Sequence, residues 1–271
     1  MTLSAKLSRE KIGEAASFIL DACAAGRLIE RLPVVCTPSD VDDAYAIQTA
    51  ILDQRNHDAG GWFVAASNPD MQRQLGLKEA YSARWGNGRF LGTGAMVSSV
   101  GSLPVALEAE ITFRLGRDLL PREKEYGAAE VIRAVDAVLP SFEVVISCFS
   151  DWMEQQPLNL IAEGGVAQLL VLGSPLQEWR SLNLAETPVT VRINGAVAAT
   201  GSGENVMGDP INVLVWLANH ASRRGIGLRG GELCNTGMCA PVCFVESGDQ
   251  ATADFGALGT VEVTIGGGKH K

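Results

Sequence analysis

The amino-acid sequence predicts an α+β fold, in which helices and strands occupy different parts of the chain instead of alternating. Two helical patterns come first, before Trp62, and strand patterns dominate from Ser98 onward. Only two further helical patterns interrupt those strands. A doubly wound parallel sheet needs a crossover helix between most of its strands, so this order argues against that architecture.

The N-terminal part of the chain predicts two helices with recognisable ends. Apolar residues recur at helical spacing over residues 8–25, and Gly26 ends that pattern. Thr37 is the expected N-cap of the second helix, because Pro38 and several acidic residues follow it. This second helix is predicted to run to about residue 57.

Short elements are predicted between these helices and the main strand region. Residues 62–66 form a strand candidate, and Asn68-Pro69 predicts the start of a short helix that runs to residue 74. Residues 78–94 are rich in glycine, arginine and aromatic residues, a composition that predicts a loop.

The second part of the chain predicts mainly strands. Apolar runs identify six strand candidates, at residues 105–115, 141–148, 166–172, 189–193, 242–245 and 261–265. Helices are predicted at residues 128–139 and, after Asp209-Pro210, at residues 211–224. The sequence has no Gly-rich dinucleotide or phosphate motif and no GxSxG motif, so nucleotide binding and serine hydrolysis are disfavoured.

Composition and charge limit the class of protein further. The chain has 271 residues, 46% of them hydrophobic, which is enough for a large core. It has neither the apolar segment of a signal peptide nor a run long enough to cross a bilayer, so we expect a cytoplasmic protein. The net charge is −9, and the densest basic cluster is Arg223-Arg224. A nucleic-acid or membrane partner is therefore not expected.

The cysteines do not form a recognisable motif. Six are present: Cys23, Cys36, Cys148, Cys234, Cys239 and Cys243. None of them has CxxC spacing, and the chain has only three histidines. This pattern predicts small buried apolar side chains in a reducing compartment and disfavours a zinc or redox site.

The most informative motif is Glu108-Ala109-Glu110, within the strand candidate at residues 105–115. A strand turns every second side chain to the same face, so both carboxylates are expected to point the same way. Like charges at this distance repel each other unless a positive charge lies between them. A hard divalent cation meets that requirement, which makes the pair a candidate for part of a metal site.

Glu143 supplies a third carboxylate, from a separate strand candidate with apolar neighbours. An isolated buried carboxylate is costly in free energy, whereas one bound to a cation is not. Glu108, Glu110 and Glu143 together suit Mg²⁺ or Mn²⁺, with water or substrate completing the coordination. For Glu108 and Glu110 alone, an exposed strand face without an ion is the alternative.

These glutamates and several other segments resemble the fumarylacetoacetate hydrolase superfamily, and within it the branch of 2-keto-4-pentenoate hydratases and 4-oxalocrotonate decarboxylases. The resemblance extends from the N-terminal helices to the final strand. The matching segments are residues 107–118, 140–143, 151–152, 171–173, 208–210, 216–219 and 236–237, with Pro69, Met71, Gln72, Leu75 and Gly76.

The resemblance implies a mixed β-roll of the fumarylacetoacetase C-terminal type at residues 96–271, preceded by a small helical region and an active-site loop at residues 1–95. It implies Mg²⁺ or Mn²⁺ held by Glu108, Glu110 and Glu143. It also implies a homo-oligomer and allows for a complex with a homologous or pathway enzyme. The implied substrate is a short 2-oxo acid that chelates the ion, which then stabilises an enolate.

Two positions depart from that branch. Where the branch usually carries a lysine, this chain has Phe63, which can neither transfer a proton nor pair with a carboxylate. The branch's Asp-Asn-Ala-Ser stretch is replaced here by Glu-Gly-Gly-Val at residues 163–166. Glu163 is therefore the candidate catalytic base, and it would need a raised pKa to act near neutrality.

Four residues are expected to contact the substrate: Phe63, Ser67, Thr236 and Gly237. At Thr236-Gly237 the contact would be a backbone N–H that meets a substrate carboxylate. The leading functional prediction is a metal-dependent lyase of the hydratase or decarboxylase type, as in aromatic meta-cleavage catabolism. The alternatives are a C–C bond hydrolase of an acylpyruvate or 1,3-dicarbonyl acid, and a non-catalytic metal-binding partner subunit.

Overall fold

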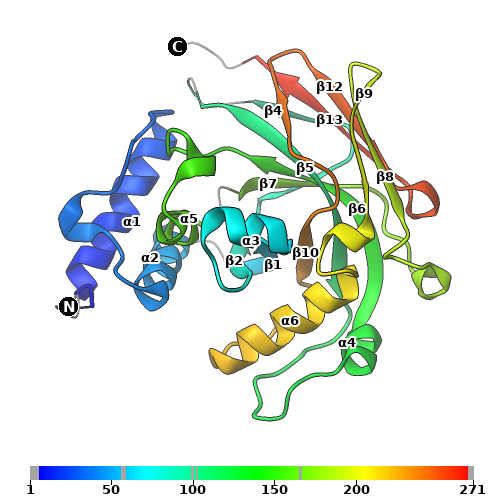
Figure 1. Cartoon of the computed structure of the whole chain (residues 1–271), viewed down its shortest axis with the longest axis horizontal. Coiled ribbons are helices and arrows are strands. Elements are labelled where there is room, and N and C mark those ends of the chain that lie inside the picture. The colour runs from blue at the N-terminus through cyan, green and yellow to red at the C-terminus, as the bar shows by residue number, and fades with distance from the viewer. Residues whose placement is uncertain (1–5, 56–58, 99–100, 102, 165–166, 268–271) are drawn as a thin grey trace.

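Two β-sheets form the centre of the computed structural model, which describes residues 6–55, 59–98, 101, 103–164 and 167–267 (Figure 1). The strands are β1 (Ala59–Ala65), β2 (Tyr81–Gly86), β3 (Phe90–Gly92), β4 (Ala95–Ser98), β5 (Val105–Leu115), β6 (Val135–Val145), β7 (Ala167–Leu172), β8 (Pro188–Ile193), β9 (Ala196–Ser202), β10 (Leu233–Met238), β11 (Cys243–Val245), β12 (Gln250–Asp254) and β13 (Thr260–Gly266).

The larger sheet has the strand order β2-β1-β10-β5-β6-β7-β3, and β11 also pairs with β5. Its central pair, β5 and β6, is antiparallel and has eleven residues in each strand. The smaller sheet has the order β4-β13-β12-β8-β9. Parallel pairs, such as β1 with β10, occur beside antiparallel ones, so the sheets are mixed. The predicted α+β fold with a mixed β-roll is confirmed.

Six helices are described: α1 (Arg9–Ala24), α2 (Val41–Gln54), α3 (Pro69–Leu75), α4 (Ala128–Ala134), α5 (Pro157–Glu163) and α6 (Pro210–Arg223). Helices α1, α2 and α5 lie together on one side of the larger sheet, and α4 and α6 lie near its far end (Figure 1). No described helix has the length and apolar character needed to cross a membrane.

The helix starts follow their capping residues. Ser8 caps α1 and Asn68 caps α3, each by accepting a hydrogen bond from a backbone N–H of the first turn. The predicted cap Thr37 is wrong for α2, because residues 34–36 form a 3₁₀ turn and the chain enters the helix later. Asp40 is the cap instead, and its carboxylate accepts the N–H of Asp43.

Two further segments differ from the prediction. The helix expected at residues 128–139 ends at Ala134, and β6 begins at Val135, where pairing with β5 overrides the helical pattern. The loop expected at residues 78–94 contains β2 and β3. Strand β2 gains its hydrogen bonds from β1, the strand that precedes it in the chain, and its own composition does not indicate this pairing. Residue 166, where one strand candidate began, lies outside the described residues.

The packing of the helices on the larger sheet positions the site. One apolar cluster joins α1, α2 and α5 to the ends of β5 and β6, through residues such as Ala106, Val145 and Phe149. A second and larger cluster fills the space between the two sheets. The glutamate-bearing strands β5 and β6 contribute to both clusters, so they are held on both faces.

Candidate metal centre

Glu108, Glu110 and Glu143 converge on one point, as the sequence predicts. Glu108 and Glu110 share a face of β5, and Glu143 on β6 is the direct cross-strand partner of Glu108. Each carboxylate offers an oxygen, and the three oxygens lie within 4.8 Å of one another. Glu110 and Glu143 are only 1% and 3% exposed. The spacing of two along one strand and the register between two strands together produce this arrangement.

Asn235 on β10 holds two of these carboxylates in place. Its Nδ2 donates to Oε2 of Glu110 at 2.7 Å and to Oε2 of Glu143 at 2.8 Å. Its own Oδ1 accepts the indole N–H of Trp85 at 2.9 Å, which fixes the orientation of the amide. Partners that orient the ligands of a metal in this way commonly set its affinity. No motif in the sequence marks Asn235 as part of this site.

Burial raises the pKa values of all three glutamates. Burial raises the pKa of Glu108 to about 7. Burial and the neighbouring charge of Glu108 raise the pKa of Glu110 to about 8, against the hydrogen bonds from Gly237 and Asn235. The pKa of Glu143 rises well above its ordinary value, first through burial and then through Glu110 and Glu108. Each glutamate therefore needs either a proton or a positive partner.

The donor set fits a hard divalent cation. Among the residues that the structure describes, none of the three glutamates forms an ion pair with lysine, arginine or histidine. Three carboxylate oxygens at this spacing match the preference of Mg²⁺ and Mn²⁺ for oxygen ligands. The positive charge that the cluster lacks is therefore the one that such an ion would bring.

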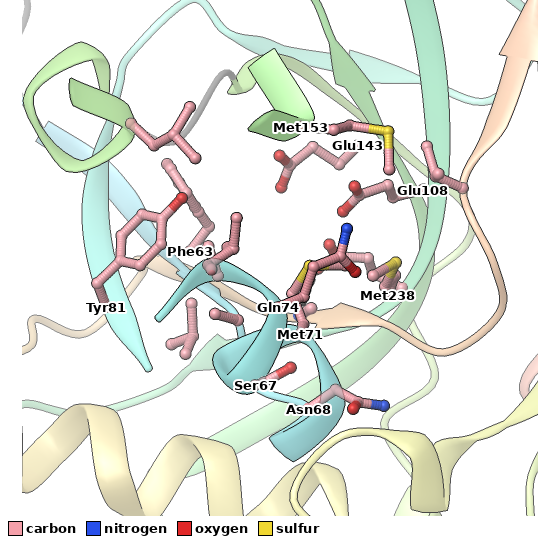
Figure 2. A pocket seen from close by; sticks show the side chains of 18 of the residues that line it. Phe63, Ser67, Asn68, Met71, Gln74, Tyr81, Glu108, Glu143, Met153 and Met238 are labelled. Atoms are coloured by element: carbon pink, nitrogen blue, oxygen red, sulfur yellow. Dashed lines mark hydrogen bonds between the residues drawn. The ribbon is translucent and has the colours of Figure 1, made fainter. Parts of the chain in front are cut away.

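A cavity opens over the glutamates, as expected for a site that binds a small molecule. Its walls are mostly apolar and include three methionines: Met71, Met153 and Met238. Figure 2 shows the carboxylates of Glu108 and Glu143 turned into this space, with the hydroxyl of Tyr81 across from them. The cavity is thus polar at the glutamates and largely apolar elsewhere.

The predicted substrate contacts divide into two groups. Phe63, Ser67 and Gly237 line the cavity. Thr236 does not line it, because its side chain turns away and donates to the carbonyl of Ile111 at 2.8 Å. The backbone N–H of Gly237 was expected to meet a substrate carboxylate, but it donates to Glu110 at 2.7 Å. Gly237 therefore orients a glutamate.

Gly237 also shows why a glycine is needed at this point. Its φ of +96° is a backbone conformation that other residues rarely adopt. A side chain would in addition collide with the Ser67 hydroxyl. The turn therefore brings the N–H of residue 237 to Glu110 only because no Cβ is present.

Glu163, the predicted base, lies outside the cavity. It is the last residue of α5, and its carboxylate accepts the Ser147 hydroxyl at 2.8 Å and the backbone N–H of Cys148 at 2.9 Å. It lines a separate hollow together with Arg55 and Arg89. Burial raises its pKa, as a base would need, but its position does not bring it to the metal-binding face.

Comparison with known proteins supports the same family. A family model described as the fumarylacetoacetate (FAA) hydrolase C-terminal domain matches residues 86–266. The 2-keto-4-pentenoate hydratase of Paraburkholderia xenovorans (strain LB400) is 34% identical over 253 residues, which cover 92% of each protein. The corresponding enzyme of Burkholderia vietnamiensis (strain G4 / LMG 22486) is 29% identical over 257 residues and covers 94% of this chain and 97% of its own.

Solved structures agree on the fold. The structure titled 4-oxalocrotonate decarboxylase from Pseudomonas putida G7, complexed with magnesium and adipate, has a TM-score of 0.89 and 23% identity, covering 97% of this chain and 100% of that chain. A fumarylpyruvate hydrolase from Pseudomonas aeruginosa, in complex with Mn²⁺ and pyruvate, has a TM-score of 0.60 and 11% identity over 76% of this chain and 88% of that chain.

The fold is a mixed β-roll in which three glutamates, two of them buried, meet at the wall of a cavity. The chain belongs to the fumarylacetoacetate hydrolase C-terminal family. This confirms the family that the sequence segments predict, and the hydratases at 29–34% identity represent the expected branch.

Proposed function

We propose that this chain is a divalent-metal-dependent lyase of the hydratase or decarboxylase type that acts on a small 2-oxo acid in the breakdown of aromatic compounds. The observation that carries the proposal is the convergence of Glu108, Glu110 and Glu143 beside a cavity with largely apolar walls. The relatives named 2-keto-4-pentenoate hydratase support the type of reaction.

Glu108, Glu110 and Glu143 would hold Mg²⁺ or Mn²⁺. The ion supplies a positive charge that polarises a carbonyl and stabilises the negative charge developing next to it. Asn235 and the N–H of Gly237 keep the carboxylates aimed at one point before any ligand arrives. The solved relatives with magnesium, calcium or manganese support a divalent cation of this kind.

Tyr81 is well placed to contact a bound substrate. It lines the cavity across from Glu108 and Glu143 (Figure 2), and the residue is 5% exposed. Burial, together with the charges of Glu143 and Glu108, raises its pKa above the ordinary value, so the hydroxyl keeps its proton near neutrality. Tyr81 would therefore donate a hydrogen bond to the substrate and keep its proton. The Ser67 hydroxyl is a second polar contact in the same cavity.

Replacing Tyr81 and Glu163 separately tests which of the two acts in the reaction. Tyr81→Phe is expected to lower kcat by about 100-fold, the usual scale for losing one hydrogen-bond donor to a developing negative charge, while the affinity for the metal stays unchanged. Glu163→Gln is expected to lower kcat by less than about tenfold, because Glu163 lies outside the cavity. Steady-state kinetics of both variants check this. The opposite ranking would return the catalytic role to Glu163.

Phe63→Lys tests how far the pocket has diverged from its relatives. Phe63 lines the cavity, so a lysine there would bring a charged amine toward the glutamates and the substrate. We expect a gain in hydratase activity on 2-hydroxypenta-2,4-dienoate. Because Phe63 is 2% exposed and packs on Trp85, Phe63→Met serves as the uncharged control for disturbed packing. Equal hydratase activity of Phe63→Lys and Phe63→Met would mean that the positive charge at residue 63 does not increase that activity.

A substrate panel tests the proposed function itself. The wild-type chain is assayed with Mg²⁺ and with Mn²⁺ on 2-oxo acids, dienoates and acylpyruvates. Hydration or CO₂ release supports the lyase, whereas cleavage of an acylpyruvate into two acids would replace it with a C–C bond hydrolase. No turnover, together with a stable complex with a lysine-bearing relative, would indicate a partner subunit. The predicted homo-oligomer is checked by light scattering on the same sample.

A further inference from the structure

A second group of metal-ligating side chains lies outside the cavity. It consists of Cys23 on α1, Cys148 just after β6, and Glu163 at the end of α5. One ligand atom from each residue lies within 4.8 Å of the others. The three residues are far apart in the sequence and do not form a spacing motif. The packing of α1 and α5 on the sheet brings them together.

The side chains of this group are largely buried, and hydrogen bonds hold the carboxylate in place. Cys148 and Glu163 are buried, at 0% and 7% exposure, and Cys23 is half-buried. The Ser147 hydroxyl and the N–H of Cys148 each donate to a different oxygen of Glu163, which fixes the carboxylate and leaves lone pairs free. The segment that bears Cys148 is itself fixed, because its carbonyl accepts the N–H of Ile29 at 2.8 Å.

The charge around this group also suits a bound divalent ion. Arg55 lies close enough to act electrostatically on Cys23, Cys148 and Glu163. Two thiolates and one carboxylate carry three negative charges, which one divalent ion and one guanidinium would balance.

We propose that Cys23, Cys148 and Glu163 form a second metal site, for a thiophilic divalent ion such as Zn²⁺. Sulfur ligands select zinc over magnesium, whereas the all-oxygen glutamate centre has the opposite preference. Binding forms two metal–sulfur bonds and releases the two thiol protons to solvent. The half-exposed side of Cys23 leaves a fourth position for water. A bound ion would link α1 and α5 to the chain that leaves β6, and so fasten the helical layer to the sheet.

Cobalt spectroscopy tests the site without relying on activity. The reduced full-length chain, in excess Mg²⁺ to fill the glutamate centre, is titrated with Co²⁺. We expect one Co²⁺ per chain with the strong visible bands of tetrahedral cobalt and a thiolate charge-transfer band, both lost on adding Zn²⁺. Cys23→Ser should lose the charge-transfer intensity. Cys36→Ser, which removes another thiol near α1, should keep it. Weak six-coordinate bands alone, or full intensity in Cys23→Ser, would overturn the site.

A second measurement needs no variant. Zn²⁺ is expected to slow the alkylation of Cys23 by iodoacetamide in the wild-type chain by at least about tenfold, since a metal-bound thiolate is the protected form. Peptide mass spectrometry reads Cys23 separately from Cys36, which should react at an unchanged rate. An unchanged rate at Cys23 with saturating Zn²⁺ would rule out the proposal even if the serine variant failed to fold.

Discussion

Replacing Glu110 with glutamine is expected to lower metal-dependent turnover by about 1,000-fold or more. The loss of one of three carboxylate ligands removes several kcal/mol of electrostatic stabilisation, and each 1.36 kcal/mol corresponds to about tenfold in rate. Glutamine keeps the shape of the side chain and one oxygen to accept the N–H groups of Asn235 and Gly237, so the fold should persist. Steady-state kinetics measure the loss of turnover, and calorimetric Mg²⁺ titration measures the accompanying loss of affinity for the metal.

The matched control is Glu262→Gln. Glu262 is also a strand glutamate, on β13, but it is exposed and lies outside the cavity. This substitution should leave both turnover and Mg²⁺ affinity within about twofold of the wild type. If Glu110→Gln kept wild-type turnover at the same Mg²⁺ concentration, the glutamate cluster would not be the catalytic metal centre.

The position of this centre could be predicted because it depends on short-range rules. Side chains two apart on a strand share a face, which pairs Glu108 with Glu110. The sequence also places Glu143 in a separate apolar strand, where a carboxylate needs a partner. What the sequence does not contain is the register, and the structure shows Glu143 directly across from Glu108. The expectation that the carboxylates face one another thus followed from local patterns, whereas their geometry required the pairing of β5 with β6.

The groups around the glutamates could not be predicted in the same way. Asn235 reaches Glu110 and Glu143 because β10 lies beside β5 in the sheet, although the two strands are more than a hundred residues apart. Tyr81 was assigned to a loop, because its segment lacks the alternation of a strand and pairs with β1, the strand that precedes it in the chain. Long-range pairing of this kind leaves no periodic signal in the sequence.

The position of Glu163 outside the cavity has a physical origin. Its position beside Gly164 in the sequence does not say which way the last turn of a short helix will face. In the structure, α5 turns Glu163 away from the cavity and toward Ser147 and Cys148, which donate one hydrogen bond to each carboxylate oxygen. A residue can therefore align with a catalytic position of a family and still be directed elsewhere by the helix that carries it.

Magnesium is expected to raise the melting temperature of the chain, and to do so more at pH 8 than at pH 5.5. Burial raises the pKa of Glu108 to about 7, and burial and the charge of Glu108 raise that of Glu110 to about 8, both above the ordinary value of 4.5. Between the ordinary pKa of 4.5 and these raised values, the two glutamates of the metal-free folded chain keep protons that the same glutamates have released in the unfolded chain. The metal-free fold therefore loses stability as the pH rises from about 4.5 to about 8.

The cation reverses this loss, because it neutralises the carboxylates once their protons are gone. At a Mg²⁺ concentration of 100 times its Kd, binding stabilises the fold by about 2.7 kcal/mol. For a chain of this size that corresponds to a rise of roughly 5–10 °C in the melting temperature. At pH 5.5 the ion must compete with the protons on the glutamates, so the rise should be smaller. Thermal unfolding followed by circular dichroism, with EDTA or with Mg²⁺, measures the rise in melting temperature at pH 8 and at pH 5.5.

Glu110→Gln provides the decisive comparison for this pH dependence. The substitution removes one buried ionisable group, so the metal-free variant should lose less stability than the wild type between pH 5.5 and pH 8. It should also gain little from Mg²⁺, because the ion has lost a charged ligand. Glu262→Gln should reproduce the wild-type curves. Identical melting of the wild type in EDTA and in Mg²⁺ at pH 8 would contradict a cation site among the three glutamates, since these are the conditions in which their uncompensated charge is greatest.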